Sequence, residues 1–224
     1  MNNFNHFFSN CILSIGWLLF FFGGMTHFSF AQNPATNDQV AQSPVDYINS
    51  NFEAATPVFW EYNPDGSVVV HMLYDHERNS PNRANYHTHF QVQAKRGADV
   101  TLHILYKNDI YNGRIVTPAY ALYQYYYISD DGIHWTTVPL ERIENGHKIK
   151  VHMNTDVLYV ANIEPYRISD LDKLLKEIKD HPLVEIEPIG TTVEGRLLEI
   201  VSVGNPSAPF RIFIRARAHP WESG

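Results

Sequence analysis

Apolar positions along the chain follow two different periods, and the change between them divides the sequence into two parts. Up to residue 163 the apolar runs are short, and residues 67–74 and 99–106 are continuously apolar or alternate, as strands do. Asn63–Gly66 is a strong turn signal before the first of these runs. The same pattern recurs at 86–92, 120–128, 148–153 and 157–161. Short strands without a long helical period predict an all-β antiparallel sandwich over residues 52–163.

The period changes to 3.6 residues at Pro165. A helix is predicted over 169–180 because its apolar residues recur at i, i+3, i+4 and i+7, namely Leu171, Leu174, Leu175 and Ile178. Ser169 is expected as the N-cap, with Asp172 in the acidic position of a capping box. Three strands are expected to follow, at 184–187, 197–203 and 210–214, the last buried on at least one face. This order predicts the start of an α/β, mixed-sheet domain over residues 164–224, the second of two domains.

The first 31 residues contain no Lys, Arg, Asp or Glu, and 12–22 is a largely apolar run. Ser29 and Ala31 form a small-x-small pattern, which predicts a signal peptide over 1–31 and a secreted or periplasmic protein without membrane contact after cleavage. The leader lacks a basic side chain, so a signal anchor that faces the protein outward is the alternative. Residues 32–51 are rich in Asn, Gln, Ser and Pro and are expected to form a polar linker or an ordered arm.

Charge and cysteine content exclude several classes of function. The 17 basic and 24 acidic residues give a formal charge of -7 without a basic tract, so nucleic acid is not an expected partner. The single cysteine, Cys11, lies in the leader. A thiol nucleophile or a cysteine-based zinc site is therefore excluded in the processed protein, and a metal site has to be built from His and carboxylates.

Three features of the predicted sandwich could carry chemistry. His87 and His89 are two residues apart, so on a strand they share a face and either chelate a metal or face solvent. Residues 129–135 resemble the Asp-box hairpin of sialidases and other β-proteins, which is a structural turn. Four tyrosines either form a stacking platform for sugar rings or are ordinary sheet residues, namely Tyr123, Tyr125, Tyr126 and Tyr127.

His219 and Glu222 directly follow the last apolar run. An imidazole nitrogen and a carboxylate three residues apart could provide two of the three protein ligands of a catalytic zinc. Ligands and catalytic groups of α/β sheets tend to lie just past the carboxyl end of a strand, which is where this pair falls. A His-x-x-acid spacing also arises by chance in a chain of this composition, so a loop His with a solvated Glu is the alternative.

The ordered series of motifs after Pro165 resembles the amino-terminal part of a zinc metallocarboxypeptidase domain (peptidase family M14). The matching stretches are 166–171, 189–196, 203–206 and 217–222. The His-Pro-x-Glu form of the last stretch is most similar to the cytosolic-carboxypeptidase-like branch, which also carries a β-sandwich directly before its catalytic domain. Residues 157–166 resemble the junction between those two domains.

The resemblance implies a zinc-dependent hydrolase that cleaves the carboxy-terminal peptide bonds of peptides or proteins, with Zn²⁺ bound by His219 and Glu222. In that family the third ligand, the general base and the substrate-carboxylate-binding residues lie well beyond the first motif, so no catalytic residue is assigned in this sequence. His181, the other histidine after Pro165, is not taken as a ligand. The 224 residues are therefore expected to be a truncated, inactive part of an enzyme that is active in its full-length form.

Two other functions remain open on the sequence. The first is a non-catalytic, secreted β-sandwich binding module for carbohydrate or another partner, followed by a degenerate carboxypeptidase remnant. The second is a sandwich that acts as a chaperone for its own catalytic domain and binds no ligand.

Overall fold

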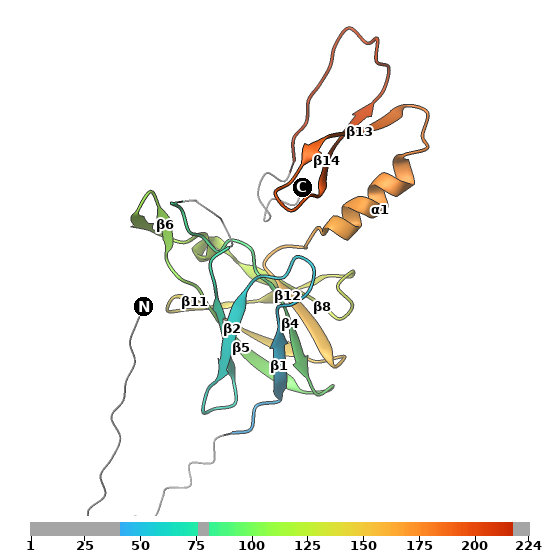
Figure 1. The fold of residues 1–224 in the computed structure, drawn as a ribbon. Coiled ribbons are helices and arrows are strands. Elements are labelled where there is room, and N and C mark those ends of the chain that lie inside the picture. Colours follow the sequence, from blue (N-terminus) through green and yellow to red (C-terminus); the bar gives the residue numbers. More distant parts are fainter. Residues whose placement is uncertain (1–40, 76–80, 217–224) are drawn as a thin grey trace, which may run out of the picture. The chain divides into compact units, whose positions relative to one another are not determined.

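The computed structural model of the chain describes residues 41–75 and 81–216 (Figure 1). These residues belong to one unit of the chain, Gln39–Gly224. The predicted leader, and the pair His219 and Glu222, lie outside the described residues.

Within the described part of the chain, no helix is both long enough and apolar enough to cross a bilayer.

Two five-stranded sheets make up the two-sheet region, which we define as the described residues up to 163. The first sheet contains, in spatial order, β1 (Val45–Asn49), β4 (His89–Ala94), β12 (Val157–Ala161), β8 (Tyr125–Ser129) and β9 (Thr136–Pro139). The second contains β10 (Glu141–Ile143), β11 (Gly146–His152), β5 (Asp99–Leu105), β3 (Val68–Met72) and β2 (Val58–Tyr62). A small hairpin of β6 (Asp109–Tyr111) and β7 (Arg114–Val116), with the 3-10 turn η1 (Ala119–Leu122), connects β5 to β8.

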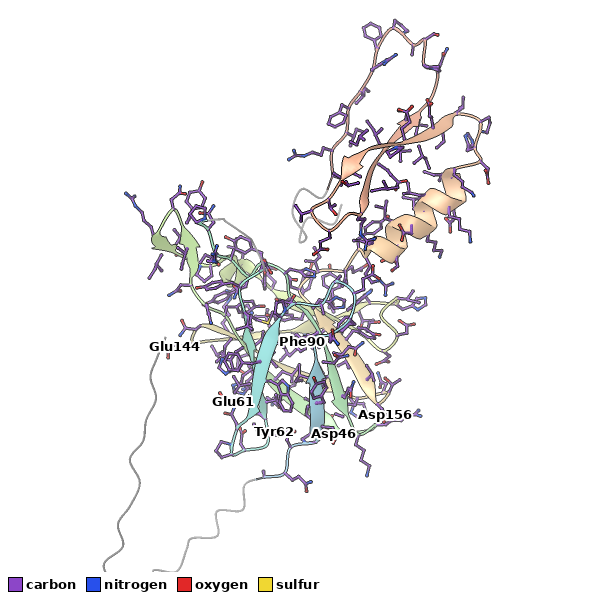
Figure 2. The ribbon with its side chains drawn as sticks, in the orientation of Figure 1. Asp46, Glu61, Tyr62, Phe90, Glu144 and Asp156 are labelled. Atoms are coloured by element: carbon purple, nitrogen blue, oxygen red, sulfur yellow. The ribbon has the colours of Figure 1, made fainter. Side chains whose placement is uncertain are left out.

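The two sheets share one hydrophobic core, because alternate residues of each strand point inward. In β5, Val100, Leu102 and Ile104 are buried while the residues between them are partly exposed. Phe90 of β4 and Tyr126 of β8 are the largest fully buried side chains (Figure 2). Burial of one large apolar side chain contributes roughly 1.5–3 kcal/mol, so this shared core is the main source of stability in the two-sheet region.

One expectation about this region is wrong: its strands are not all antiparallel. β3 pairs with β5 in parallel, with Val68 opposite Leu102, whereas every other pairing of the ten strands is antiparallel. Between β3 and β5 the chain leaves the second sheet, forms β4 in the first sheet and then returns. A strand's alternation shows which residues are buried but not its direction, so the sequence pattern could not reveal this crossover.

The boundaries of several elements also differ from the predicted ones. β1 lies within 32–51, in the segment that was expected to be a linker or an ordered arm. The run at 120–128 divides into η1 and β8, and the strand predicted at 86–92 begins only at His89. Five further strands were not predicted, namely β2, β6, β7, β9 and β10; most of them are short or largely exposed, so their apolar pattern is weak.

The C-terminal segment, residues 164–216, contains one helix and one hairpin. Helix α1 (Ile168–Ile178) is followed by β13 (Val184–Thr191) and β14 (Leu197–Val203), which pair antiparallel around a turn at Gly195 with φ +78°. The hairpin is hydrogen-bonded to neither five-stranded sheet. No residue of α1 is buried, so the apolar face that the sequence predicts for this helix is present but uncovered among the described residues.

Helix α1 begins differently from the prediction. Its N-cap is Arg167 rather than Ser169, and the acidic residue of the first turn is Asp170, whose Oδ2 accepts a hydrogen bond from the Arg167 N–H at 2.8 Å. The predicted pair of Ser169 and Asp172 therefore does not form a capping box. Ser169 instead lies inside the helix, and both its N–H and its hydroxyl bond to Glu53 of the two-sheet region.

The strand predicted at 210–214 is also wrong within the described structure. This stretch has no assigned strand, and its large apolar side chains are 77–88% exposed. A strand requires a neighbour that satisfies its N–H and C=O groups, and the described β13 and β14 pair only with each other. An apolar run alone is therefore not sufficient to form the strand.

We expect the start of β11 to tolerate no side chain. A Cβ at Gly146 would overlap the carbonyl oxygen of Ile104, whereas a Cβ at Gly190 in β13 meets nothing within 4 Å. Gly146→Ala should lower the free energy of unfolding by roughly 1–3 kcal/mol, and Gly190→Ala should change it by less than about 0.5 kcal/mol. Urea titrations that find equal midpoints for the two variants would contradict this packing.

Candidate functional site

The described residues contain no group of three or more His, Cys, Asp or Glu side chains that could hold a metal ion. The candidate residues that the structure describes are His87, His89, the turn at 129–135 and the four tyrosines. Two shallow hollows of about 480 and 400 Å³ lie on the two-sheet region, and neither is lined by a predicted site residue that the structure describes.

His87 and His89 do not face solvent, so that predicted alternative is wrong, and no group of three or more potential metal ligands includes them among the described residues. Their side chains are buried, and Nε2 of His87 and Nδ1 of His89 lie 2.9 and 3.0 Å from the same oxygen, the carbonyl of Ala54. A carbonyl oxygen can only accept, so both ring nitrogens must carry the proton, which fixes one tautomer for each ring. The two histidines act as a pair of donors that hold one backbone carbonyl.

The carbonyl belongs to a turn that needs such support. Ala54 has φ +60°, in the left-handed region that costs a residue with a Cβ about 1 kcal/mol or more. The preceding Phe52 packs edge-on against His89 and Tyr159, with ring centroids 4.9 and 5.7 Å apart. The turn at 52–55 is therefore held by the packing of Phe52 and by the two hydrogen bonds to the carbonyl of Ala54, its strained residue.

Burial keeps His89 neutral. It lowers the pKa of His89 to about 4, although the bond to Ala54 opposes this change, and the electrostatic effects of His87 and Arg167 lower the pKa further. The imidazole is thus uncharged at neutral pH, and its Nδ1 carries the proton that is donated to the Ala54 carbonyl.

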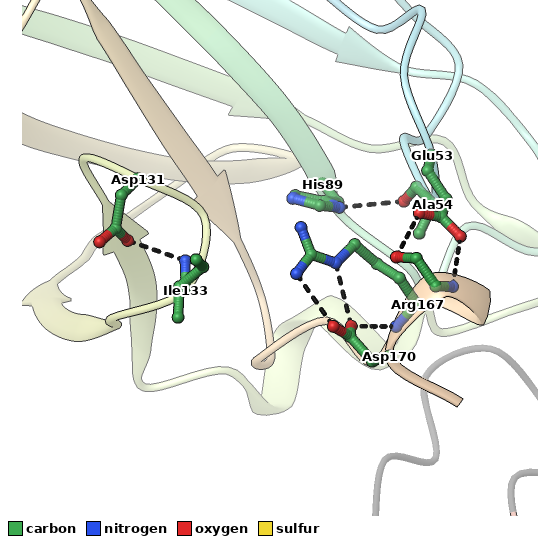
Figure 3. Close-up of polar contacts among 8 residues, drawn as sticks. Glu53, Ala54, His89, Asp131, Ile133, Arg167 and Asp170 are labelled. Carbon is green, nitrogen blue, oxygen red and sulfur yellow. Dashed lines mark hydrogen bonds and ion pairs between the residues drawn. The ribbon is translucent and has the colours of Figure 1, made fainter. Parts of the chain in front are cut away.

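A cluster of charged residues surrounds the start of α1, next to this turn (Figure 3). Glu53 Oε1 accepts the N–H of Ser169 at 2.9 Å, and Oε2 accepts its hydroxyl at 2.7 Å. Arg167 donates from Nε and Nη2 to Asp170 at 2.9 and 3.0 Å. These bonds, first the Ser169 hydroxyl and then its N–H, lower the pKa of Glu53, and the Arg167 side chain likewise lowers that of Asp170.

The stretch 129–135 forms the structural turn that its sequence predicts. Asp131 Oδ1 accepts the N–H of Ile133 at 2.8 Å (Figure 3). It also accepts the N–H of His134 at 2.8 Å, and the N–H of Gly132 donates to the hydroxyl of Ser129. Bonds from the His134 ring and backbone hold the pKa of Asp131 well below its ordinary value. All of these contacts lie within the turn, so the carboxylate is engaged in holding the loop.

The four tyrosines do not form a flat platform. Tyr126 is buried in the core and Tyr123 is held by the backbone of Tyr86 and by Asn162, so both are structural. The rings of Tyr125 and Tyr127 meet at an interplanar angle of 78°, which gives a sugar ring no common face on which to stack.

A buried polar chain that the sequence did not suggest runs through the core. Thr88 Oγ1 and Tyr106 Oη are 2.7 Å apart, Tyr106 and Tyr126 hydroxyls 2.6 Å, and Tyr126 Oη lies 3.0 Å from His147 Nδ1. Burial raises the pKa values of both tyrosines. It also lowers the pKa of His147 to about 4, with the nearby charge of Arg142. The chain joins Tyr106, which directly follows β5, and His147 of β11 to Tyr126 of β8 in the other sheet, so its role is to satisfy polar groups inside the core.

Solved carboxypeptidases have a similar structure. A metallo-carboxypeptidase from Burkholderia cenocepacia gives a TM-score of 0.60 at 18% identity, over 74% of this chain and 41% of that one. The chain has a carboxypeptidase-like fold. A metallo-carboxypeptidase from Pseudomonas aeruginosa, in complex with (2-guanidinoethylmercapto)succinic acid, gives 0.56 at 18% identity, over 72% and 41%. A Shewanella denitrificans protein provisionally assigned as a carboxypeptidase A gives 0.59 at 24% identity, over 72% and 40%.

Because these sequence identities are only 18–24%, the comparison supports a similar fold and not a shared activity. The chain spans about 40% of the length of the structures that it matches. No protein-family model matches the sequence, and no curated protein matches it significantly.

The buried histidines predict a loss of stability in mild acid. An unfolded His titrates near pH 6.5, while His89 and His147 titrate at about 4 in the fold, so between these values the unfolded chain binds more protons. The free energy of unfolding should therefore fall as the pH is lowered from about 6.5 towards 4.

The measurement is a set of urea titrations at pH 7.5, 6 and 5. His147→Gln keeps a hydrogen-bonding group beside Tyr126 but cannot be protonated in this range, so its stability should depend less steeply on pH. His181→Gln, at an exposed position, is the matched control and should follow the wild type. An unchanged pH slope in His147→Gln would show that this imidazole is not kept neutral by the fold.

Proposed function

We propose that the chain is part of a zinc-dependent metallocarboxypeptidase that hydrolyses the carboxy-terminal peptide bonds of peptides or proteins. The observation that carries this proposal is the agreement of two independent signals. The described residues have a carboxypeptidase-like fold, and the sequence that follows α1, β13 and β14 contains the His-Pro-x-Glu motif of His219 and Glu222.

We assign the two parts of the chain to two domains. The two-sheet region is proposed to be a β-sandwich, because both sheets contribute to one core. Residues 164–224 are proposed to be the amino-terminal part of the catalytic domain, since the β13–β14 hairpin is bonded to neither sheet. This order of domains favours the cytosolic-carboxypeptidase-like branch.

His219 and Glu222 are the proposed metal ligands. A neutral imidazole nitrogen and a carboxylate oxygen are donors that suit Zn²⁺, so the chemistry of the pair fits the metal, and a third protein ligand is needed to complete the site. When bound, zinc would polarise the scissile carbonyl and lower the pKa of a bound water to about 7. The His219 imidazole has to be unprotonated to bind, so zinc affinity should fall in acid.

Uncovered apolar surface supports the assignment of activity to the full-length enzyme. Leu171 and Leu174 of α1, Leu197 of β14 and the side chains of 210–214 are all exposed among the described residues. Apolar surface of this extent normally contacts further polypeptide. The exposed surface and the 40% coverage of the similar structures together favour a larger catalytic domain.

The leader gives the proposed location. A signal peptide over 1–31 places the enzyme outside the cytoplasm, either secreted or periplasmic, and an uncleaved leader would instead anchor it to the membrane facing outward.

We expect the enzyme from the full open reading frame to hold about one zinc ion and to release carboxy-terminal residues from peptide substrates. His219→Ala/Glu222→Ala should lose both zinc and activity, because an imidazole and a carboxylate ligand are removed together. Metal content by mass spectrometry and amino-acid release from blocked dipeptides are the two measurements.

The control is His181→Ala/Glu185→Ala, which removes one exposed His and one exposed Glu from the same segment. It should keep zinc and activity. The 224-residue chain alone is expected to hydrolyse nothing. A full-length protein that is metal-free and inert in both forms would instead favour a non-catalytic, secreted binding module.

A further inference from the structure

Helix α1 lacks an acceptor of its own at its N-terminus. The first N–H groups of a helix have no partner within the helix and are usually bonded by a Ser, Thr, Asp or Asn at the N-cap. In α1 the N-cap is Arg167, whose guanidinium has donors only. Asp170 reaches back to the N–H of Arg167, but it leaves the N–H of Ser169 for another group to satisfy.

Glu53 supplies this acceptor from the two-sheet region, 116 residues earlier in the chain. One carboxylate oxygen binds the Ser169 N–H and the other binds the Ser169 hydroxyl, so the two-atom contact also fixes the orientation of the carboxylate. A negative charge at this end of a helix is further favoured by the helix dipole. The contact therefore does for α1 what a local N-cap normally does.

Two other charged side chains, Arg167 and Asp170, lie near Glu53 at the start of α1. Arg167 is paired with Asp170 and attracts Glu53, while the charge of Asp170 opposes the ionisation of Glu53. His89 and Tyr159 face Arg167 from the two-sheet region, and His89 is neutral there. One cation thus lies among two carboxylates at the start of the helix (Figure 3).

The support beneath Glu53 is rigid. Its neighbour Ala54 has a left-handed backbone and presents its carbonyl to His87 and His89, while Phe52 packs on Tyr159. A strained turn persists only where its surroundings over-determine it, and such turns are enriched at functional positions. Here the strain places one carboxylate at the end of a helix from another part of the chain.

We infer that the turn at 52–55 is a latch, in which Glu53 caps helix α1 and thereby fixes the C-terminal segment to the two-sheet region. This inference does not depend on the proposed activity. It gives the two-sheet region a specific task, namely to complete and position the first helix of the segment that leads to His219 and Glu222.

The test is hydrogen exchange of the full chain with Glu53→Ala and Glu53→Gln. Loss of an N-cap acceptor costs about 1 kcal/mol, so the amides at 169–171 should exchange roughly five- to tenfold faster in Glu53→Ala. Glu53→Gln keeps one acceptor oxygen and should show a smaller increase. Core amides of β5 and β11 should be unchanged in both, which separates opening of the latch from global unfolding.

Glu144→Ala is the matched control, since Glu144 is an exposed glutamate in the β10–β11 turn (Figure 2). It should leave exchange at 169–171 as in the wild type. Equal exchange at 169–171 in Glu53→Ala and Glu144→Ala would overturn the latch, and so would an equal acceleration in the core of the two-sheet region.

A second measurement tests the contribution of Ser169, the residue that Glu53 contacts. The bonds from Ser169 lower the pKa of Glu53, so the capping contact is present above the ordinary Glu pKa and is lost as the pH falls through the lowered value. In Ser169→Ala the side-chain bond is gone, and the pKa of Glu53 followed by NMR should move towards its ordinary value.

A double-mutant cycle tests whether the two residues are coupled. In the Glu53→Ala background, Ser169→Ala should accelerate hydrogen exchange of the α1 amides less than it does in the wild-type background. Additive effects and an unmoved Glu53 pKa would show that the two residues are not coupled.

Discussion

Two buried imidazoles converge on one carbonyl oxygen, that of Ala54, and much of the arrangement around the junction depends on this contact. Burial holds the His89 ring neutral, and each of the two rings donates a hydrogen bond to an oxygen with two lone pairs. The contact keeps the turn between β1 and β2 in a strained conformation. Two residues that resemble a metal-binding pair in the sequence are thus structural.

Burial differs sharply between the two parts of the chain. The two-sheet region buries its large apolar side chains between its sheets, and its buried tyrosines and His147 satisfy one another through a continuous chain of hydrogen bonds. The C-terminal segment has the same kind of apolar pattern, but α1 has no buried residue and the strand-like run at 210–214 is exposed. The described residues of the segment thus have a paired hairpin and the capping contact with Glu53, but not the buried apolar core that stabilises the two-sheet region.

Fold and function are supported by different observations. The likeness to metallo-carboxypeptidases, at TM-scores of 0.56–0.60 and identities of 18–24%, concerns the arrangement of the backbone. The same fold can carry different activities, so the proposed chemistry rests on specific groups. Those groups are His219 and Glu222, whose residue types and place after the hairpin are read from the sequence. The two-sheet region contributes at the opposite end of the segment, at the first turn of α1.

The sequence by itself determined the elements whose cause is local. Alternation located β3, β5, β11 and β12, the 3.6-residue period located α1, and the Ser-Asp-Asp-Gly pattern at 129–132 predicted its turn, because each depends on neighbouring residues alone. Only the tertiary structure decided what depends on distant residues. The parallel pairing of β3 with β5 follows from a crossover between sheets, and the burial of His87 and His89 follows from the position of Ala54. The helix begins at Ile168 and not after Ser169 because Glu53, 116 residues away from Ser169, provides the acceptor that a local N-cap would have supplied.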